Sequence, residues 1–281
     1  MSSKRDFISI PAVSSEACDR GNVVILRMEK VSKNFSGLTA LQEVTFGIEE
    51  RAIKALIGPN GAGKTTLLQI ISGILRVSSG QVWYKEKEIT WTPPHKICFL
   101  GVARTFQLIR LFPNMSVLEN VMTGRHTRGR TGVLSAGLRL PMVLKEEKKA
   151  REEAQSILEF MGIGEKAHWE ATSLPYAQQR MVEIARALAS KPSLLMLDEP
   201  AEGMNAQEME LLAEKIMKIR ESGVTVLLIE HHMGMVMDIS DQILVLNYGQ
   251  VIAEGPPKAI QDDPRVIEAY LGKKDSHASD K

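Results

Sequence analysis

Residues 58–66 combine groups suited to holding a chain of phosphates. They fit the pattern G-x-x-x-x-G-K-[ST] and read Gly58, Pro59, Asn60, Gly61, Ala62, Gly63, Lys64, Thr65 and Thr66. Glycines let backbone N–H groups wrap an anion without Cβ clashes, and a following helix adds its positive end. Lys64 would reach the β- and γ-phosphates, and the Thr65 hydroxyl would bind Mg²⁺. A plain glycine turn would account for Gly58 but not for lysine followed by threonine, so we predict a nucleotide-phosphate site.

Two adjacent acids could supply the other half of this chemistry. The apolar run Leu194–Leu197 is followed directly by Asp198 and Glu199. Open α/β sheets bind ligands at the carboxyl ends of such buried strands. We expect Asp198 to hold Mg²⁺, directly or through water, and Glu199 to polarise an attacking water as general base. Alone, the acids would fit an ordinary polar loop equally well; together with Lys64 they indicate cleavage of a phosphate bond.

The elements that must position these residues form a βαβ pattern. Ile53–Ile57 is a predicted strand before the glycine loop, and a helical pattern runs from Lys64 to about Ile71. Further on, the Leu194–Leu197 and Thr225–Ile229 strands enclose a helical stretch over Gln207–Ile219. Strand, helix and strand in this order predict a parallel α/β sheet.

The middle of the chain has a different pattern. Val117–Val121, Lys145–Met161 and Gln178–Ala189 are helical by period, with no strand signal between them, which predicts an all-α insertion. The mixed charges at 145–153 are typical of a solvated helix face rather than of a nucleic-acid patch. Near the end, residues 247–249 predict a hairpin turn.

The composition excludes several classes of protein. Of the 281 residues, 44% are hydrophobic and 25% charged, which is ordinary for a folded globular chain, and the net charge of +1 predicts no nucleic-acid partner. No apolar run approaches the roughly 18 residues of a spanning helix, so any membrane role is expected to come through a partner. Cys18 and Cys98 lack metal-ligand spacing and favour a reducing compartment. The first 21 residues do not fit a signal peptide.

Taken in order, these motifs and four further stretches resemble the nucleotide-binding subunit of an ATP-binding cassette (ABC) transporter, over roughly residues 23–272. The matching elements are Gly58–Thr66 as Walker A, Gln107 as the Q-loop, the signature Leu174, Pro175, Tyr176, Ala177 and Gln178, Leu194–Glu199 as Walker B, Gly203–Asn205 as the D-loop, and His231 as the switch histidine. The resemblance implies a P-loop NTPase fold with a parallel core sheet, an antiparallel β subdomain and a helical subdomain.

The resemblance also assigns roles to single residues. Phe35 would stack on adenine, although by residue type alone it is more often a core side chain. Gln107 would complete the shell of Mg²⁺ and water and face the membrane partner. His231 would bind near the γ-phosphate and position Glu199 and the water; it follows the Thr225–Ile229 strand by two positions, as the family's histidine does, and is preferred to His232, which stands where relatives often carry Asp.

Within the family, the chain is most similar to ATPases of branched-chain (hydrophobic) amino-acid importers. This rests on Leu38–Leu41, the long linker Gly124–Arg151 after Ser116–Val121, and the ending Val266–Gly272. Lipopolysaccharide-export ATPases share part of the pattern and remain an alternative. A soluble ABC ATPase is a second one, but this chain has one Walker A and no sustained heptads. A non-catalytic cassette would lack Lys64 or Glu199, and an unrelated P-loop kinase would leave the Gln107-to-His231 series unexplained.

The signature departs from the family's Leu-Ser-Gly-Gly-Gln or Leu-Ser-Tyr-Gly-Gln. Pro175 removes a hydroxyl and an N–H together, and Ala177 adds a Cβ where relatives have glycine. In relatives these groups contact the γ-phosphate held by the opposite subunit. We therefore expect one weakened composite site, tolerable in a heterodimer whose partner brings an intact signature to the Lys64 site.

The implied assembly is two ATPase subunits, identical or different, that sandwich two Mg-ATP and drive a pair of membrane permeases, with a solute-binding protein in the same system. The chain would sit at the cytoplasmic face of the inner membrane through its permeases, which Gln107 and the helical insertion would contact. We expect a flexible tail at 1–22, the first part of the ATP-binding core at 23–107, the helical subdomain at 108–189, the second part of the core at 190–255, and a C-terminal helix and tail at 256–281.

Overall fold

The computed structural model describes residues 23–125 and 141–271. The expected tails, Cys18 and the centre of the Gly124–Arg151 linker lie outside these ranges. The strands are β1 (Val24–Phe35), β2 (Leu38–Glu49), β3 (Ile53–Ile57), β4 (Ser79–Tyr84), β5 (Lys87–Glu88), β6 (Val102–Arg104), β7 (Leu194–Asp198), β8 (Thr225–Ile229), β9 (Gln242–Asn247) and β10 (Gln250–Gly255). The α-helices are α1 (Lys64–Ile71), α2 (Pro94–Leu100), α3 (Val117–Thr123), α5 (Pro141–Met161), α6 (Tyr176–Ala189), α7 (Ala206–Glu221), α8 (Met233–Ile239), α9 (Pro257–Gln261) and α10 (Pro264–Leu271).

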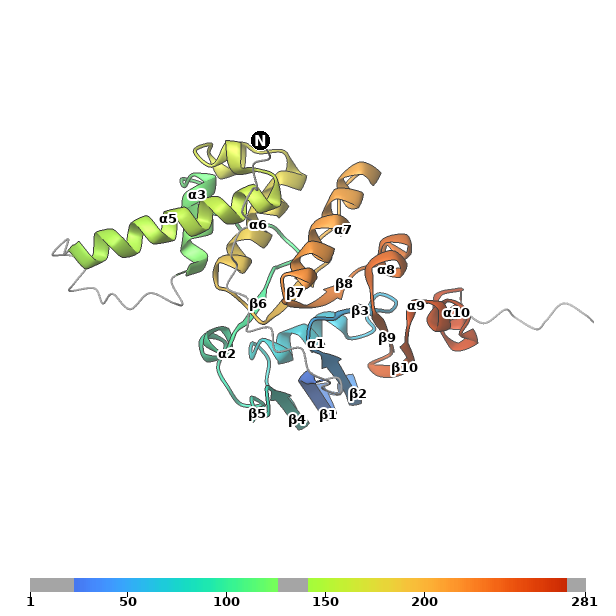
Figure 1. Ribbon diagram of the computed structural model, residues 1–281. Helices are drawn as coiled ribbons and strands as arrows, with labels where there is room; N and C mark the ends of the chain where they lie inside the picture. Colours follow the sequence, from blue (N-terminus) through green and yellow to red (C-terminus); the bar gives the residue numbers. More distant parts are fainter. Residues whose placement is uncertain (1–22, 126–140, 272–281) are drawn as a thin grey trace, which may run out of the picture.

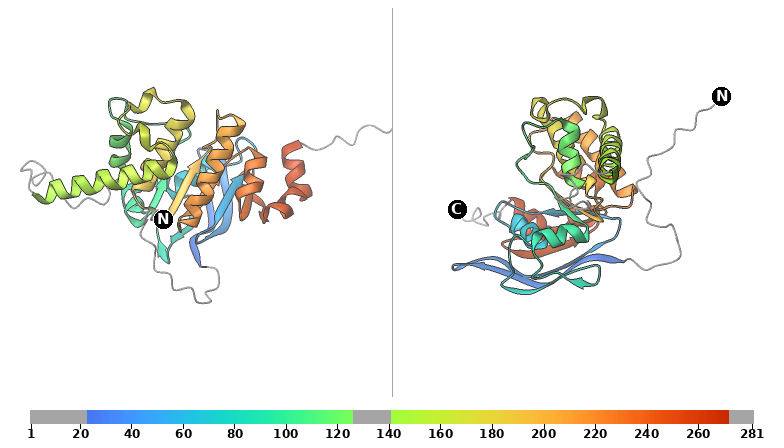
Figure 2. Two further views of the ribbon diagram at one scale, coloured as in Figure 1. Left: turned by 45° about the horizontal axis from the view of Figure 1, so that its top comes forward. Right: turned by 90° about the vertical axis from the view of Figure 1, so that its left-hand side faces the viewer.

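These strands form two sheets that face each other across α1 (Figures 1 and 2). The larger sheet has the order β10-β9-β3-β8-β7-β6, and only β10 is antiparallel to its neighbour. The smaller sheet, β2-β1-β4-β5, is wholly antiparallel. The predicted combination of a parallel core sheet, an antiparallel β portion and a helical part is confirmed.

Burial on both faces explains why the core strands read as continuous apolar runs. On β7, Leu194 and Met196 pack toward α1 and the antiparallel sheet, while Leu195 and Leu197 pack toward the helices on the opposite face. Every residue of β3, β7 and β8 is buried. The parallel sheet is thus a rigid layer whose strand ends are fixed in space.

Helices α3, α5 and α6 gather on the side of the large sheet away from the antiparallel sheet (Figures 1 and 2). Their apolar faces meet in one cluster that includes Leu118, Leu158 and Val182. Ser116 caps α3 in a reciprocal capping box with Glu119, which fixes where that helix begins. No helix in the described ranges is both long and apolar enough to cross a bilayer.

Candidate nucleotide site

The sheet brings the predicted phosphate loop and acids to one edge. Because β3, β7 and β8 are parallel and in register, with Asp198 opposite Ile229 and Leu56 opposite Ile229, the residues after each strand lie at the same carboxyl edge. Gly58 follows β3 and Glu199 follows β7. This placement unites segments that the sequence keeps more than a hundred residues apart.

The phosphate loop has a backbone that glycine allows. Gly58, Gly61 and Gly63 have φ of 151°, 80° and 104°. A Cβ on Gly58 would lie 2.1 Å from the carbonyl oxygen of Leu246, and a Cβ on Gly63 would lie 2.7 Å from that of Ala40. Neighbouring strands therefore enclose the loop so closely that only glycine fits at these two positions.

Gly58→Ala is expected to destabilise the fold by about 2–6 kcal/mol, because the positive φ and the overpacking against Leu246 each cost about 1–3 kcal/mol. Gly61→Ala is the matched control, since Gly61 also has a positive φ but a Cβ there would meet no atom within 4 Å. Urea denaturation of both variants measures the difference. Equal losses of stability would show that the contact with Leu246 costs nothing.

Lys64 is the first residue of α1, and its side chain folds back over the phosphate loop. Its Nζ donates to the carbonyl oxygens of Gly58 at 2.6 Å and Pro59 at 3.1 Å, and the residue is 9% exposed. Burial lowers the pKa of Lys64, while the carboxylates of Glu199 and Asp198 act in the opposite direction. Among the described residues, the hydrogen bonds of this buried cation go to two carbonyl oxygens, which leaves the lysine poised to bind an incoming anion.

Beside this lysine a cavity of about 500 Å³ opens to the surface. It is lined by residues 60–66 of the phosphate loop, by Gln107 and Glu199, and by Phe35, Leu38, Thr39, Ala40 and Tyr248. The ring of Phe35 is 40% exposed, so it is not a core side chain. The Nζ of Lys33 stands 4.8 Å from the centre of that ring. Phe35 and Tyr248 thus offer aromatic surface in the cavity that the phosphate loop lines.

Gln107 and Glu199 meet inside the cavity. The Gln107 Nε2 donates to Oε2 of Glu199 at 2.9 Å, across 92 positions of sequence. Glu199 itself has the positive φ of 48°, unusual for a residue with a side chain, and its N–H donates to the Ile229 carbonyl at 3.0 Å. Strain of this kind, held in place by neighbours, is typical of functional positions.

Asp198 is buried and paired. It is 4% exposed, and its Oδ2 accepts a hydrogen bond from Nη2 of Arg104 at 2.9 Å. Arg104 ends β6, the neighbour of β7, and also carries its guanidinium 5.5 Å from the centre of the Phe106 ring. The sequence analysis did not assign this arginine; its position two residues before the Phe106-Gln107 pair was the available signal.

The described residues fit a bound Mg²⁺. The exposed Thr65 hydroxyl, the Gln107 side-chain carbonyl and the Asp198 carboxylate are oxygen groups at one edge of the sheet, and oxygen is the ligand type that Mg²⁺ prefers. Arg104 and Lys64 already balance part of the negative charge of the two acids.

His231 follows Glu230, a second residue that the sequence analysis missed. Glu230 is 1% exposed; its Oε1 accepts from the Ala201 N–H at 2.7 Å and its Oε2 from the His231 N–H at 3.1 Å. It therefore ties the segment after Asp198-Glu199 to the histidine. Oε2 also lies 3.0 Å from Nδ1 of His232, so that ring is held by Glu230 while His231 is exposed. The available signal was an acid directly after an apolar strand.

The signature residues lie elsewhere, at the start of α6. Pro175 is its N-cap and makes no side-chain capping bond. Pro175 and Tyr176 are exposed, whereas Ala177 is only 8% exposed and packs in the helical cluster. Neither these residues nor His231 and Asp198 line the 500 Å³ cavity in the described chain. The Ala177 methyl thus faces inward, away from the surface where we expected it to interfere.

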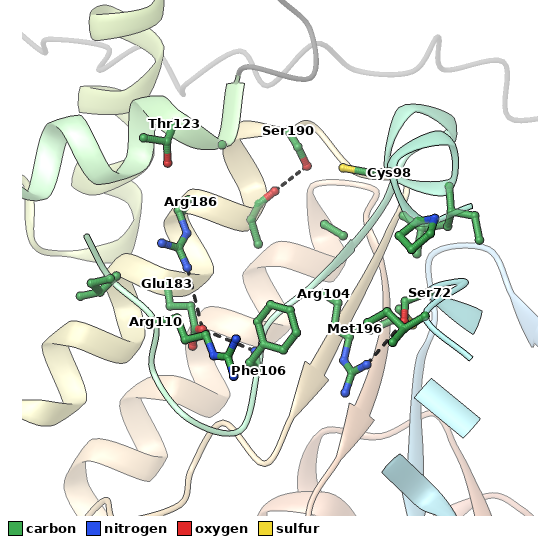
Figure 3. A pocket seen from close by; sticks show the side chains of 18 of the residues that line it. Ser72, Cys98, Arg104, Phe106, Arg110, Thr123, Glu183, Arg186, Ser190 and Met196 are labelled. Carbon is green, nitrogen blue, oxygen red and sulfur yellow. Dashed lines mark hydrogen bonds and ion pairs between the residues drawn. The ribbon is translucent and has the colours of Figure 1, made fainter. Parts of the chain in front are cut away.

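A second hollow, of about 890 Å³, lies between the core and the helical part (Figure 3). Its lining comes from α2, β6, the 106–112 segment, the end of α3 and α6. The Phe106 ring in this groove stands between the guanidinium groups of Arg104 at 5.5 Å and Arg110 at 5.4 Å. Gln107, the next residue, reaches the nucleotide cavity, so one segment connects the two hollows.

Residues 41–202 match the family described as ABC transporter. The chain belongs to the ABC transporter family. Residues 250–276 of this cassette match a second family, the branched-chain amino acid ATP-binding cassette transporter. The cassette is 43% identical over 249 residues to the high-affinity branched-chain amino acid transport ATP-binding protein BraF of Pseudomonas aeruginosa, which covers 88% of this chain and 98% of that protein. It is 40% identical, with the same coverage, to LivG of Escherichia coli, which has the same description.

Among solved structures, the cassette resembles a nucleotide-free ATP-binding cassette from an ABC transporter, with a TM-score of 0.78 and 33% identity over 89% of this chain and 100% of that one. An ADP conformation of an ATP-binding cassette is equally similar, at a TM-score of 0.78 and 33% identity. The predicted family and nucleotide-binding fold are confirmed.

Proposed function

We propose that the chain is the ATP-hydrolysing subunit of a membrane importer of branched-chain or other hydrophobic amino acids. The observation that carries hydrolysis is the Gln107–Glu199 contact of 2.9 Å in a cavity that Lys64 also lines. The importer assignment is supported by the transport proteins BraF and LivG and by the match at residues 250–276. These matches favour the importer over a lipopolysaccharide exporter or a soluble ABC ATPase.

ATP would occupy the cavity with its base against Phe35 and its phosphates in the 58–66 loop. Lys64 would exchange the Gly58 and Pro59 carbonyls for phosphate oxygens, which is favourable because a charge-assisted bond to an anion is stronger than one to a neutral carbonyl. Thr65, Gln107 and Asp198 would hold Mg²⁺, which when bound neutralises charge on the β- and γ-phosphates.

Glu199 would then act on the attacking water. Its carboxylate takes the water proton as the oxygen attacks the γ-phosphorus, the bond between that phosphorus and the β–γ bridging oxygen breaks, and ADP and phosphate are released. Gln107 fixes the carboxylate through its 2.9 Å contact. His231 would orient the γ-phosphate and the water. The backbone of His231 is itself fixed, because its N–H donates to Oε2 of Glu230.

The assembly completes the mechanism. Two ATPase subunits, identical or different, would sandwich two nucleotides, each phosphate loop facing the other subunit's signature. Closure on ATP and reopening after hydrolysis would switch a permease pair seated on the Phe106 groove, at the cytoplasmic face of the inner membrane, with a solute-binding protein delivering the amino acid.

The deciding experiment is affinity purification of the tagged chain from detergent-solubilised membranes, followed by mass spectrometry. Multi-spanning proteins, a second ATPase and a solute-binding protein are the expected partners. Recovery of soluble or ribosomal partners alone, with the chain absent from membranes, would contradict the importer and favour a soluble ABC ATPase.

Phe35→Ala is expected to weaken ATP binding roughly 5- to 150-fold, because base stacking on an aromatic ring contributes about 1–3 kcal/mol. Phe35→Tyr should bind as the wild type does. Phe99→Ala is the control, since Phe99 is 65% exposed on α2 and does not line the cavity. Equilibrium binding of a fluorescent ATP analogue measures the effect; equal affinity for Phe35→Ala and wild type would remove the stacking role.

A further inference from the structure

Helix α6 contains an ion pair that is almost completely buried. Arg180 is 0% exposed and Glu183 is 2% exposed, and Nη1 of the arginine contacts Oε2 of the glutamate at 2.6 Å. Removing both charges from water is costly, and apolar residues of similar volume often stabilise a fold as well or better. The pair therefore calls for an explanation other than stability.

The two side chains hold the backbone of the Gln107 segment. Arg180 donates from Nη1 to the Phe106 carbonyl at 2.7 Å and from Nη2 to the Gln107 carbonyl at 2.7 Å. The Phe106 N–H faces Oε1 of Glu183 at 3.4 Å. Two residues three positions apart on one helix thus hold three consecutive peptide units, from Thr105–Phe106 to Gln107–Leu108, that lie more than seventy positions upstream.

The same helix carries the signature. Arg180 Nη2 also donates to the Tyr176 hydroxyl at 3.2 Å, and Tyr176 follows the N-cap Pro175. A single helical turn, about 5.4 Å, separates Arg180 from the exposed start of α6. On the other side, Phe106 and Glu183 line the 890 Å³ groove, where Figure 3 shows them joined by a dashed contact.

We propose that Arg180, held by Glu183, is a positioning residue that locks the Gln107 segment to the signature helix α6. A permease segment that binds in the groove and displaces Phe106 would then move the Gln107 segment and the signature helix together. The claim that a permease moves the two segments together, which we call the coupling, rests on the proposed transport function. The claim that Arg180 links the two segments, which we call the locking role, concerns contacts within this chain alone.

Arg180→Lys separates locking from simple stabilisation. Lysine keeps the charge opposite Glu183, but its donors all lie on one nitrogen at the end of a different stem, so it cannot reproduce the separate bonds that Nη1 makes to the Phe106 carbonyl and Nη2 makes to the Gln107 carbonyl. Amide hydrogen exchange of the full chain should then be about fivefold faster in peptides covering both 105–110 and 173–179, as expected for one lost hydrogen-bonded link. Arg186→Lys is the matched control, because Arg186 on the same helix approaches Glu183 only at 4.0 Å.

Faster exchange confined to 173–179, or the same pattern in Arg186→Lys, would overturn the locking role. In the complex purified with its permeases, Arg180→Lys should lower the stimulation of ATP turnover by substrate-loaded binding protein about tenfold, with the KM for ATP unchanged; unchanged stimulation would overturn the coupling. Because exchange is measured on the chain by itself, its result stands whether or not permeases are recovered, so failure of the proposed function is distinguishable.

Discussion

Glu199→Gln is expected to lower ATP turnover by about 10²- to 10⁴-fold while ATP stays bound, because positioned general bases contribute rate factors of that size. Glutamine has nearly the same shape, and its side-chain carbonyl can still accept from Gln107, which now donates to Glu199 at 2.9 Å. The variant loses the proton acceptor but keeps the pocket. ATP should therefore accumulate uncleaved and trap the closed dimer.

Turnover is measured as phosphate release from the purified complex, and trapping as ATP-dependent dimer formation by size-exclusion chromatography. Glu214→Gln is the matched control, because Glu214 lies half-exposed on α7 and pairs only with Lys218 of the same helix in the described contacts. Hydrolysis by Glu199→Gln at the wild-type rate would show that another group accepts the proton.

The position of this base illustrates what the sequence could predict. The phosphate loop and β7 were found because their signals are local: a fixed glycine spacing between strand and helix, and an apolar run that ends in acids. The contact of Gln107 with Glu199 was not predicted, because the family resemblance placed Gln107 in the shell of Mg²⁺ and water and gave the positioning of Glu199 to His231. No periodicity in the sequence relates two side chains 92 positions apart.

Other features had little local signal. Strand β6 has three residues and β5 has two, too few for an alternation to be visible, and neither was predicted. Arg104 contacts Asp198 because β6 packs beside β7. Arg180 contacts the Gln107 carbonyl because α6 packs against the 106–112 segment. Arg104 stands in the Q-loop stretch and Arg180 directly follows the signature, but nothing in the sequence shows which acids and carbonyls these two arginines contact.

The structure also changes how the unusual signature is understood. We expected both Pro175 and Ala177 to obstruct the contact with the opposite nucleotide. Ala177 is buried, so glycine there would remove a packed methyl and cost about 1 kcal/mol of helix stability. Pro175 is exposed at the N-cap, where its missing hydroxyl and N–H leave an anion without two donors. Most of the impairment is therefore assigned to Pro175.

Pro175→Ser is accordingly expected to raise turnover of the assembled complex about 10- to 150-fold at the composite site that this signature completes, because one charge-assisted hydrogen bond contributes about 1.5–3 kcal/mol. Serine would also supply the N-cap hydroxyl that α6 lacks, worth about 1 kcal/mol to the helix. Adding Ala177→Gly should give little more. Pro175→Ala is the control, because it restores the N–H without the hydroxyl.

Single-turnover phosphate release separates the two sites of a heterodimer, since only the site completed by Pro175 should accelerate. We expect a faster rate at the site that Pro175 completes and an unchanged rate at the Lys64 site of this chain. This result would establish that the Walker motifs of this subunit are competent, and that its signature impairs the site on the opposite subunit. Turnover unaffected by Pro175→Ser, with or without Ala177→Gly, would mean that the proline signature already contacts the nucleotide as well as serine does, and the asymmetric heterodimer would have to be abandoned.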